Sequence, residues 1–231
     1  MPLTFALVIF ELVVMVLSIS LHDSAQAWMA NRLGDPTARM MNRISMNPAK
    51  HFDWFGMVIW PVLYIFFTPL ILGWGKPVPM TTRNFRRGSR DEMVATLAGP
   101  AAQFLTAIVA LVILIVLRHV NHDTMLSIVF AEPLAHRQLT SVPQLPSIFP
   151  LILFLYFCIL VNLLLFVFNL LPLPFLDGGK ILLHYLPYNA AQTFQRYAIY
   201  FMFAFMFLGM GVIIALVNPL LGIFNQLLMS F

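Results

Sequence analysis

Long apolar runs with very few charged residues are the feature that most restricts what this chain can fold into. Apolar residues make up 61% of the 231 residues and charged residues only 10%, whereas soluble domains carry about 25% charged residues. A helix needs about 20 apolar residues to cross a bilayer core of about 30 Å. Five runs approach or exceed that length: residues 12–21 together with the residues before them, 54–75, 93–117, 138–176 and 197–231.

These runs predict an all-α polytopic membrane protein with about five to six transmembrane helices, forming a single membrane-embedded domain over residues 1–231. The fourth run contains Pro143, Pro146 and Pro150, so part of it is expected to be loop. The first run lacks the basic flank and the small-residue cleavage site of a signal peptide, so we expect it to be a retained helix. We expect a multi-pass protein of the cell (inner) membrane of a prokaryote.

Basic residues concentrate in two loops, and the net charge is +4. Loops beside membrane spans are basic for topological reasons, so the expected partner is the lipid bilayer and not nucleic acid. The two loops flank the candidate span 54–75, so we expect them to lie on opposite sides of the membrane, and charge does not decide the orientation. The loops contain Arg32, Arg39, Arg43 and Lys50, and Lys76, Arg83, Arg86, Arg87 and Arg90.

The first loop contains a short alternating segment. After the turn signal Gly34-Asp35-Pro36, the apolar residues Ile44 and Met46 alternate with polar neighbours over 43–47. A period of two is typical of a strand. The sequence therefore predicts a short strand at the membrane surface after the first helix.

Polar residues lie near the ends of the first and fourth runs, where ionisable groups are costly and usually functional. His22, Asp23 and Gln26 end the first run. In the fourth run, Pro172 and Pro174 stop the helix just before Asp177. Broken backbone at membrane depth is tolerated only against protein or a wet cavity. The residues alone leave two interpretations of Asp177: a carboxylate held inside the bundle, or a solvated helix end.

The residues at 22, 23 and 26 have the spacing of a metalloprotease helix. Positions i and i+4 share a helix face, and His-Glu-x-x-His uses this spacing to aim two imidazoles at one zinc ion while the glutamate activates water. Here His22 and Gln26 occupy the two ligand positions, and Asp23 occupies the glutamate position. Asp177 offers a distant carboxylate.

An ordered series of motifs resembles the site-2 protease family of intramembrane zinc metalloproteases, from the first helix to about Leu183. The resemblance implies a zinc ion at His22, Asp177 and position 26, with Asp23 as the base and Asn169 beside the metal. It also implies transmembrane segments of other membrane proteins as substrates. The further motifs are Gly34-Asp35-Pro36-Thr37-Ala38, Asn47-Pro48-Ala49-Lys50-His51-Phe52-Asp53, Gly73-Trp74-Gly75-Lys76-Pro77-Val78-Pro79, Ala98-Gly99-Pro100, and Asn169-x-x-Pro172 before Leu176-Asp177-Gly178-Gly179.

Two departures from the family pattern weaken the expected chemistry. Gln26 offers only an amide oxygen, which is a poor zinc donor compared with imidazole. Asp23 is one methylene shorter than glutamate, and a displacement of about 1 Å can lower a rate by about a hundredfold. We expect a site that binds zinc weakly or is empty, in a scaffold that is weakly active or inactive. Whether the chain is an enzyme stays open.

Two other functions remain as alternatives. One is a non-catalytic pseudoprotease that binds or sequesters membrane proteins. The other is a small membrane transporter, because polar residues at helix breaks also mark solute pathways, although no inverted repeat is visible. We expect Glu11 to have an interfacial or helix-pairing role and Cys158 to be a buried thiol. The remaining histidines are not expected to bind metal: His51, His119, His122, His136 and His184.

Overall fold

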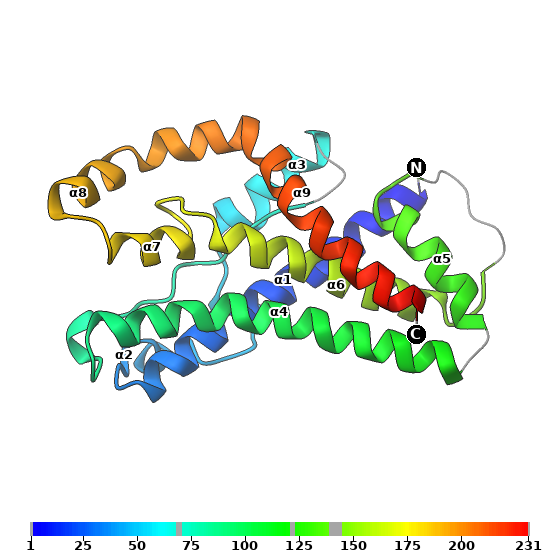
Figure 1. Ribbon diagram of the computed structural model, residues 1–231, viewed down its shortest axis with the longest axis horizontal. Helices are drawn as coiled ribbons and strands as arrows, with labels where there is room; N and C mark the ends of the chain where they lie inside the picture. The colour runs from blue at the N-terminus through cyan, green and yellow to red at the C-terminus, as the bar shows by residue number, and fades with distance from the viewer. Residues whose placement is uncertain (1, 68–70, 121–122, 139–144, 231) are drawn as a thin grey trace.

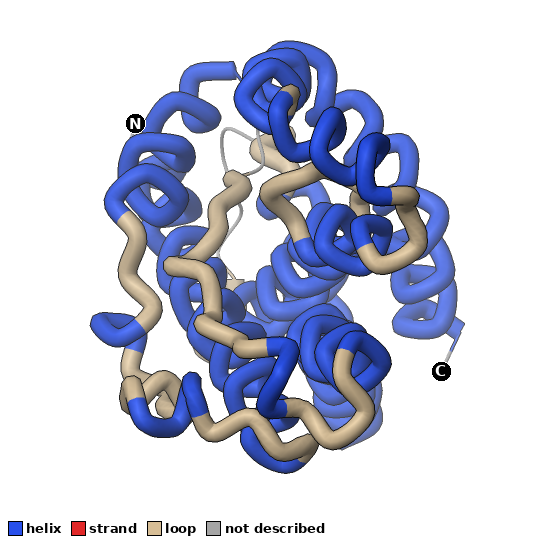
Figure 2. The backbone as a smooth tube through the Cα atoms, turned by 90° about the vertical axis from the view of Figure 1, so that its left-hand side faces the viewer, coloured by secondary structure: helices blue, strands red, loops and turns tan. Residues whose placement is uncertain are grey.

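The computed structural model describes residues 2–67, 71–120, 123–138 and 145–230, and within them it contains helices and loops without strands (Figure 2). Four helices are long and apolar enough to cross a membrane. They are α1 (Pro2–Arg32), α4 (Ser89–Val120), α6 (Phe149–Leu170) and α9 (Ala198–Ser230). The predicted all-helical class is confirmed, whereas the predicted five to six spans become four among the described residues.

Helix α6 lies at the centre of the bundle and packs against α1, α4, α9 and the shorter α5 (Asp123–Ala135) (Figure 1). Most of its side chains are buried, as expected of a helix that is apolar on all sides. It starts with Pro150 in its first turn, where a proline is tolerated. It ends at Leu170 because Pro172 and Pro174 disfavour helical backbone.

The run 54–75 does not cross the bundle. It forms one turn of π-helix over Phe55–Ile59 and the eight-residue α3 (Trp60–Phe67), and residues 71–79 return as an irregular segment. The two limbs are in contact, because the Trp74 amide donates to the Gly56 carbonyl at 3.3 Å. A Cβ on Gly56 would lie 2.2 Å from the Trp74 carbonyl oxygen, so this close approach requires glycine. The run therefore enters and leaves at the same end of the bundle.

Both basic loops consequently lie at one end, together with the short helices α2 (Thr37–Met40), α7 (Asp177–Leu183) and α8 (Tyr188–Arg196) (Figure 1). The Arg86 amide donates to the Leu33 carbonyl at 3.2 Å, which joins the second loop to the first. The assumption that these loops lie on opposite sides of the membrane is therefore wrong. Nine of the 13 Lys and Arg residues lie in these two loops, so the positive-inside rule predicts that this end is cytoplasmic.

Cysteine labelling tests this topology. In a Cys158→Ala background, we expect Ala49→Cys and Ser89→Cys to be protected from a membrane-impermeant maleimide in intact cells. His119→Cys, at the other end of α4, is expected to react. The background variant without added cysteines is the control. Labelling of only one of Ala49→Cys and Ser89→Cys would contradict the shared location of the two loops.

The predicted strand over 43–47 is wrong, because this segment consists of bends and irregular backbone. Local hydrogen bonds pair two of its backbone amides: the Arg43 amide donates to the Ala38 carbonyl, and the Ser45 amide donates to the Arg43 carbonyl. The Asn47 side chain accepts a hydrogen bond from the Ala49 amide and caps the next short helix. The alternation instead reflects one inward side chain, Arg43, among exposed or half-buried neighbours.

Asp35 links the two basic loops through its buried carboxylate. It accepts hydrogen bonds from the Thr37 amide (3.0 Å) and hydroxyl (2.5 Å), the Thr81 amide (2.7 Å) and the Asn84 side chain (3.0 Å). Burial raises the pKa of the Asp35 carboxyl, but the hydrogen bonds from Thr37, Asn84 and Thr81 outweigh burial and hold that pKa below its usual range.

We expect Asp35 to make the fold sensitive to acid. A carboxyl whose pKa is lower in the folded state binds fewer protons there, so its stabilisation is present above its unfolded pKa and is lost as the pH falls through the folded pKa. Asp35→Asn should remove about 1–3 kcal/mol at neutral pH, because it places an amide against backbone donors. Melting temperatures in detergent at pH 7 and pH 3 should therefore differ more for the parent than for Asp35→Asn, because the loss begins only below the unfolded pKa of 3.8. Equal acid sensitivity of the two proteins would contradict this role.

Candidate functional site

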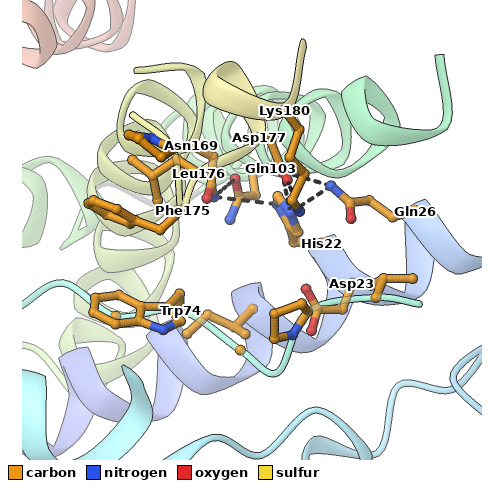
Figure 3. A pocket seen from close by; sticks show the side chains of 16 residues that line it. His22, Asp23, Gln26, Trp74, Gln103, Asn169, Phe175, Leu176, Asp177 and Lys180 are labelled. Atoms are coloured by element: carbon orange, nitrogen blue, oxygen red, sulfur yellow. Dashed lines mark hydrogen bonds and ion pairs between the residues drawn. The ribbon is translucent and has the colours of Figure 1, made fainter. Parts of the chain in front are cut away.

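A cavity of about 310 Å³ lies among α1, α4, the end of α6, the start of α7 and the returning segment 73–78 (Figure 3). His22, Gln26, Gln103, Asn169, Asp177 and Lys180 form one cluster at this cavity, and Asp23 and Trp74 lie below them in this view. The structure thus brings together all five site residues that the sequence predicts: His22, Asp23, Gln26, Asn169 and Asp177.

His22 points from α1 toward Asp177, and its Nε2 lies 2.9 Å from the Asp177 Oδ2. Both side chains are buried. The backbone of α4 comes so close that a Cβ on Gly99 would lie 2.5 Å from the His22 Nε2. The small residue at 99 therefore makes room for the imidazole. This contact settles the two interpretations of Asp177 in favour of a carboxylate held inside the bundle.

The Asp177 carboxylate is fully engaged by donors. Its Oδ1 accepts from the Lys180 Nζ at 2.8 Å, and its Oδ2 accepts from the Gln26 Nε2 at 2.7 Å as well as facing His22. The two following glycines permit this position. A Cβ on Gly178 would lie 2.2 Å from the Leu170 carbonyl oxygen. The broken end of α6 thus packs directly against the first turn of α7.

Gln26 faces the site with its amide nitrogen and not with its oxygen. The nitrogen donates to Asp177 and also to the Thr96 carbonyl at 2.9 Å. Pro100 has no N–H, so the carbonyl four residues earlier, that of Thr96, lacks its helical donor. With two acceptors facing it, the amide cannot turn its oxygen inward without repulsion. Gln26 therefore presents a donor where a metal ligand must present a lone pair.

Asp23 belongs to a second cluster. Its Oδ2 lies 3.2 Å from the His51 Nδ1 and 3.4 Å from the Arg43 Nη2. Arg43 also donates to the Lys76 carbonyl at 2.5 Å and to the Pro77 carbonyl at 3.3 Å. The Asp23 carboxylate, at the base position, therefore contacts the first basic loop through Arg43 and His51. The preceding residue, His22, contacts Asp177 instead.

The other polar candidates lie apart from this cavity. Glu11 accepts from the Ile71 amide at 2.5 Å and pairs with Arg137 at 3.0 Å, so it joins α1 to two other segments. His184 lies 3.9 Å from the Glu92 carboxylate. His119 is exposed at the end of α4, His136 lines a separate cavity between α5 and α9, and His122 lies outside the described residues.

The residues present do not fit the zinc ion that the metalloprotease pattern implies. A catalytic zinc site needs three protein ligands in addition to water. This cavity offers the imidazole of His22 and the carboxylate of Asp177, and Gln26 turns a donor toward both. Within the described residues, no group of three or more His, Cys, Asp or Glu side chains could hold a metal ion.

The fold and cavity define a helical membrane protein with the layout of an intramembrane metallopeptidase. A family profile described as "Peptidase family M50" matches residues 10–209. "Putative zinc metalloprotease YwhC" of Bacillus subtilis (strain 168) is 32% identical over 173 residues, which cover 75% of this chain and 67% of the relative. No solved structure shows a significant match. The chain belongs to peptidase family M50, the site-2 protease family, which confirms the resemblance.

Four residues of the site escaped prediction from the sequence: Arg43, Thr96, Gln103 and Lys180. Arg43 was visible only as one of several loop cations. Lys180 lies three residues after Asp177, and this spacing places both on one face of α7. Pro100 marked a freed carbonyl in α4, but its partner was not identifiable because Gln26 lies 70 residues away.

Proposed function

We propose that this chain is a membrane-embedded site-2 protease scaffold that binds transmembrane segments of other membrane proteins in the cavity beside His22 and hydrolyses them weakly or not at all. The orientation of Gln26 carries this proposal. Its nitrogen donates to Asp177 and to the Thr96 carbonyl, so the position that holds a second histidine in the family pattern supplies no metal ligand.

The cavity suits an unwound stretch of a membrane helix. Trp74, Val78 and Phe175 provide apolar lining, and Gln103 and Asn169 provide amides. Apolar side chains of a membrane segment can pack on the apolar lining. The exposed backbone groups of that segment need the two side-chain amides, because an unsatisfied peptide group in an apolar environment is costly.

Asp23 supports weak or absent hydrolysis. A general base must reach the proton that it removes, within hydrogen-bond distance or through one water. The Asp23 carboxylate instead faces Arg43 and His51 at 3.4 and 3.2 Å. The carboxylate would have to leave these two partners before it could accept a proton from a water molecule in the cavity.

Binding and hydrolysis are measured separately on the full-length protein in lipid nanodiscs. The probe is a dye-labelled synthetic single-span peptide with Asn-Pro at its centre, and the matched control peptide has Leu-Leu there. We expect saturable binding of the first peptide in fluorescence anisotropy, weaker binding of the control, and no product by mass spectrometry.

Metal analysis of the same preparation, after incubation with zinc and removal of the excess, completes the test. We expect far less than one zinc ion per chain. Stoichiometric zinc together with cleavage would overturn the proposed inactivity. Absence of binding of either peptide would overturn the proposed binding function.

A further inference from the structure

Gln103 carries an unpaired hydrogen-bond donor at the cavity. The side chain projects from α4 and is completely buried. Its Oε1 accepts from the Asn169 Nδ2 at 3.2 Å, whereas its Nε2 has no partner among the described residues. Leaving a buried donor unpaired is unfavourable, and most buried polar groups are hydrogen-bonded, so an exception of this kind needs an explanation.

A chain of hydrogen bonds fixes which end of the Gln103 amide faces the cavity. The Asp177 carboxylate only accepts, so the His22 Nε2 that faces it at 2.9 Å carries a proton. On the other side of the ring, the Asn169 Nδ2 lies 3.5 Å from the His22 Nδ1. The same Asn169 nitrogen donates to the Gln103 Oε1. The Gln103 nitrogen is therefore directed away from Asn169, into the cavity (Figure 3).

The surrounding charges favour a neutral acceptor as the ligand of this donor. The Asp177 and Asp23 carboxylates both line the cavity, and their cations, Lys180 and Arg43, are already paired with them. An anionic ligand would be repelled by these carboxylates, because the two cations beside them are already paired. A cation would meet the positive end of the Gln103 amide. A peptide carbonyl oxygen is neutral and accepts one or two hydrogen bonds.

We propose that the Gln103 Nε2 donates a hydrogen bond to a backbone carbonyl oxygen of the bound membrane segment and thereby fixes the position of that segment in the cavity. This inference rests on the proposed function, because it names the anchor of the same bound segment. Gln103 is therefore a binding and positioning residue. Its amide, on the α4 side of the cavity, donates a hydrogen bond and does not itself exchange a proton.

The variant Gln103→Met tests the proposal, because methionine has a similar size and no donor. Removing a donor that is unpaired in the free protein should leave the melting temperature unchanged or slightly higher, although the Asn169 contact is lost. Peptide affinity should fall by about tenfold, which corresponds to about 1.4 kcal/mol for one buried hydrogen bond. A purely structural residue would give the reverse: a lower melting temperature with unchanged affinity.

A second arm identifies the acceptor on the peptide. Replacing one central amide by an ester weakens the carbonyl as an acceptor. Scanned across the Asn-Pro region, one such ester should weaken binding to the parent protein and have no further effect on Gln103→Met. Equal loss in both proteins at every position would overturn the proposed partner.

The outcomes separate the two proposals. If the parent binds no peptide, the proposed function and this inference both fail. If the parent binds and Gln103→Met binds equally well, only the role of Gln103 fails. Gln103→Glu is a further control, because it replaces the free donor by an acceptor at nearly constant size and should weaken binding at least as much as methionine does.

Discussion

Stoichiometric zinc binding is expected for the double variant Asp23→Glu/Gln26→His and not for the parent protein. A histidine at 26 adds a third ligand to His22 and Asp177. Metal-bound histidines usually donate their other N–H to a carbonyl or carboxylate, and the carbonyl of Thr96, which now accepts from Gln26, is already in place for this bond. The scaffold therefore already offers a hydrogen-bond acceptor, the Thr96 carbonyl, for a histidine at position 26.

The expected gain in zinc affinity is at least a hundredfold, because structural zinc sites total roughly 10–16 kcal/mol over their ligands and one ligand supplies several of these. Metal content by mass spectrometry and zinc titration with a competing chelator measure it. Gln26→His alone should bind zinc without efficient cleavage. Asp23→Glu alone should bind none, and Asp177→Asn added to the double variant should abolish binding.

One zinc ion per chain in the parent would contradict this prediction and the orientation that we assign to Gln26. Zinc bound only by the double variant, together with cleavage of the Asn-Pro peptide, would show that the two substitutions are the whole difference from an active protease. Zinc without cleavage would place the remaining defect at Asp23 and its partners, Arg43 and His51.

Gly179→Ala is expected to be the most destabilising glycine-to-alanine substitution in this region. A Cβ at 179 would lie 1.8 Å from the Leu173 carbonyl oxygen and 3.0 Å from the Pro174 nitrogen. These are backbone atoms next to prolines, so they cannot move aside as a flexible side chain can. Overpacking costs about 1–3 kcal/mol, and at the upper end the melting temperature should fall by about 10 °C in a chain of this size.

The matched control is Gly211→Ala in α9, where a Cβ would meet no atom within 4 Å. Glycine inside a helix is about 0.5–1 kcal/mol less favourable than alanine, so this variant should be as stable as the parent or slightly more stable. Thermal unfolding in detergent measures both. Equal melting temperatures for the two variants would show that α7 is not packed against 173–174 as described.

Much of the fold and of the site was predictable because both depend on local patterns. The apolar runs predicted the helical membrane class. The spacing of His22 and Gln26 predicted that these two side chains share one face of α1, with Asp23 next to His22. Pro172 and Pro174 predicted the break that presents Asp177. The predicted strand failed because five alternating residues do not identify the side chain that turns inward. The span count failed because hydropathy alone does not distinguish a crossing helix from a segment that returns.

The sequence by itself determined that this chain is a helical membrane protein of site-2 protease ancestry with an altered residue at position 26. Only the tertiary structure decided what that residue does. The orientation of an amide depends on the acceptors that face it, and those facing Gln26 come from other helices, Thr96 of α4 and Asp177 of α7. The shared end of the two basic loops was decided in the same way, by hydrogen bonds between residues far apart in the chain.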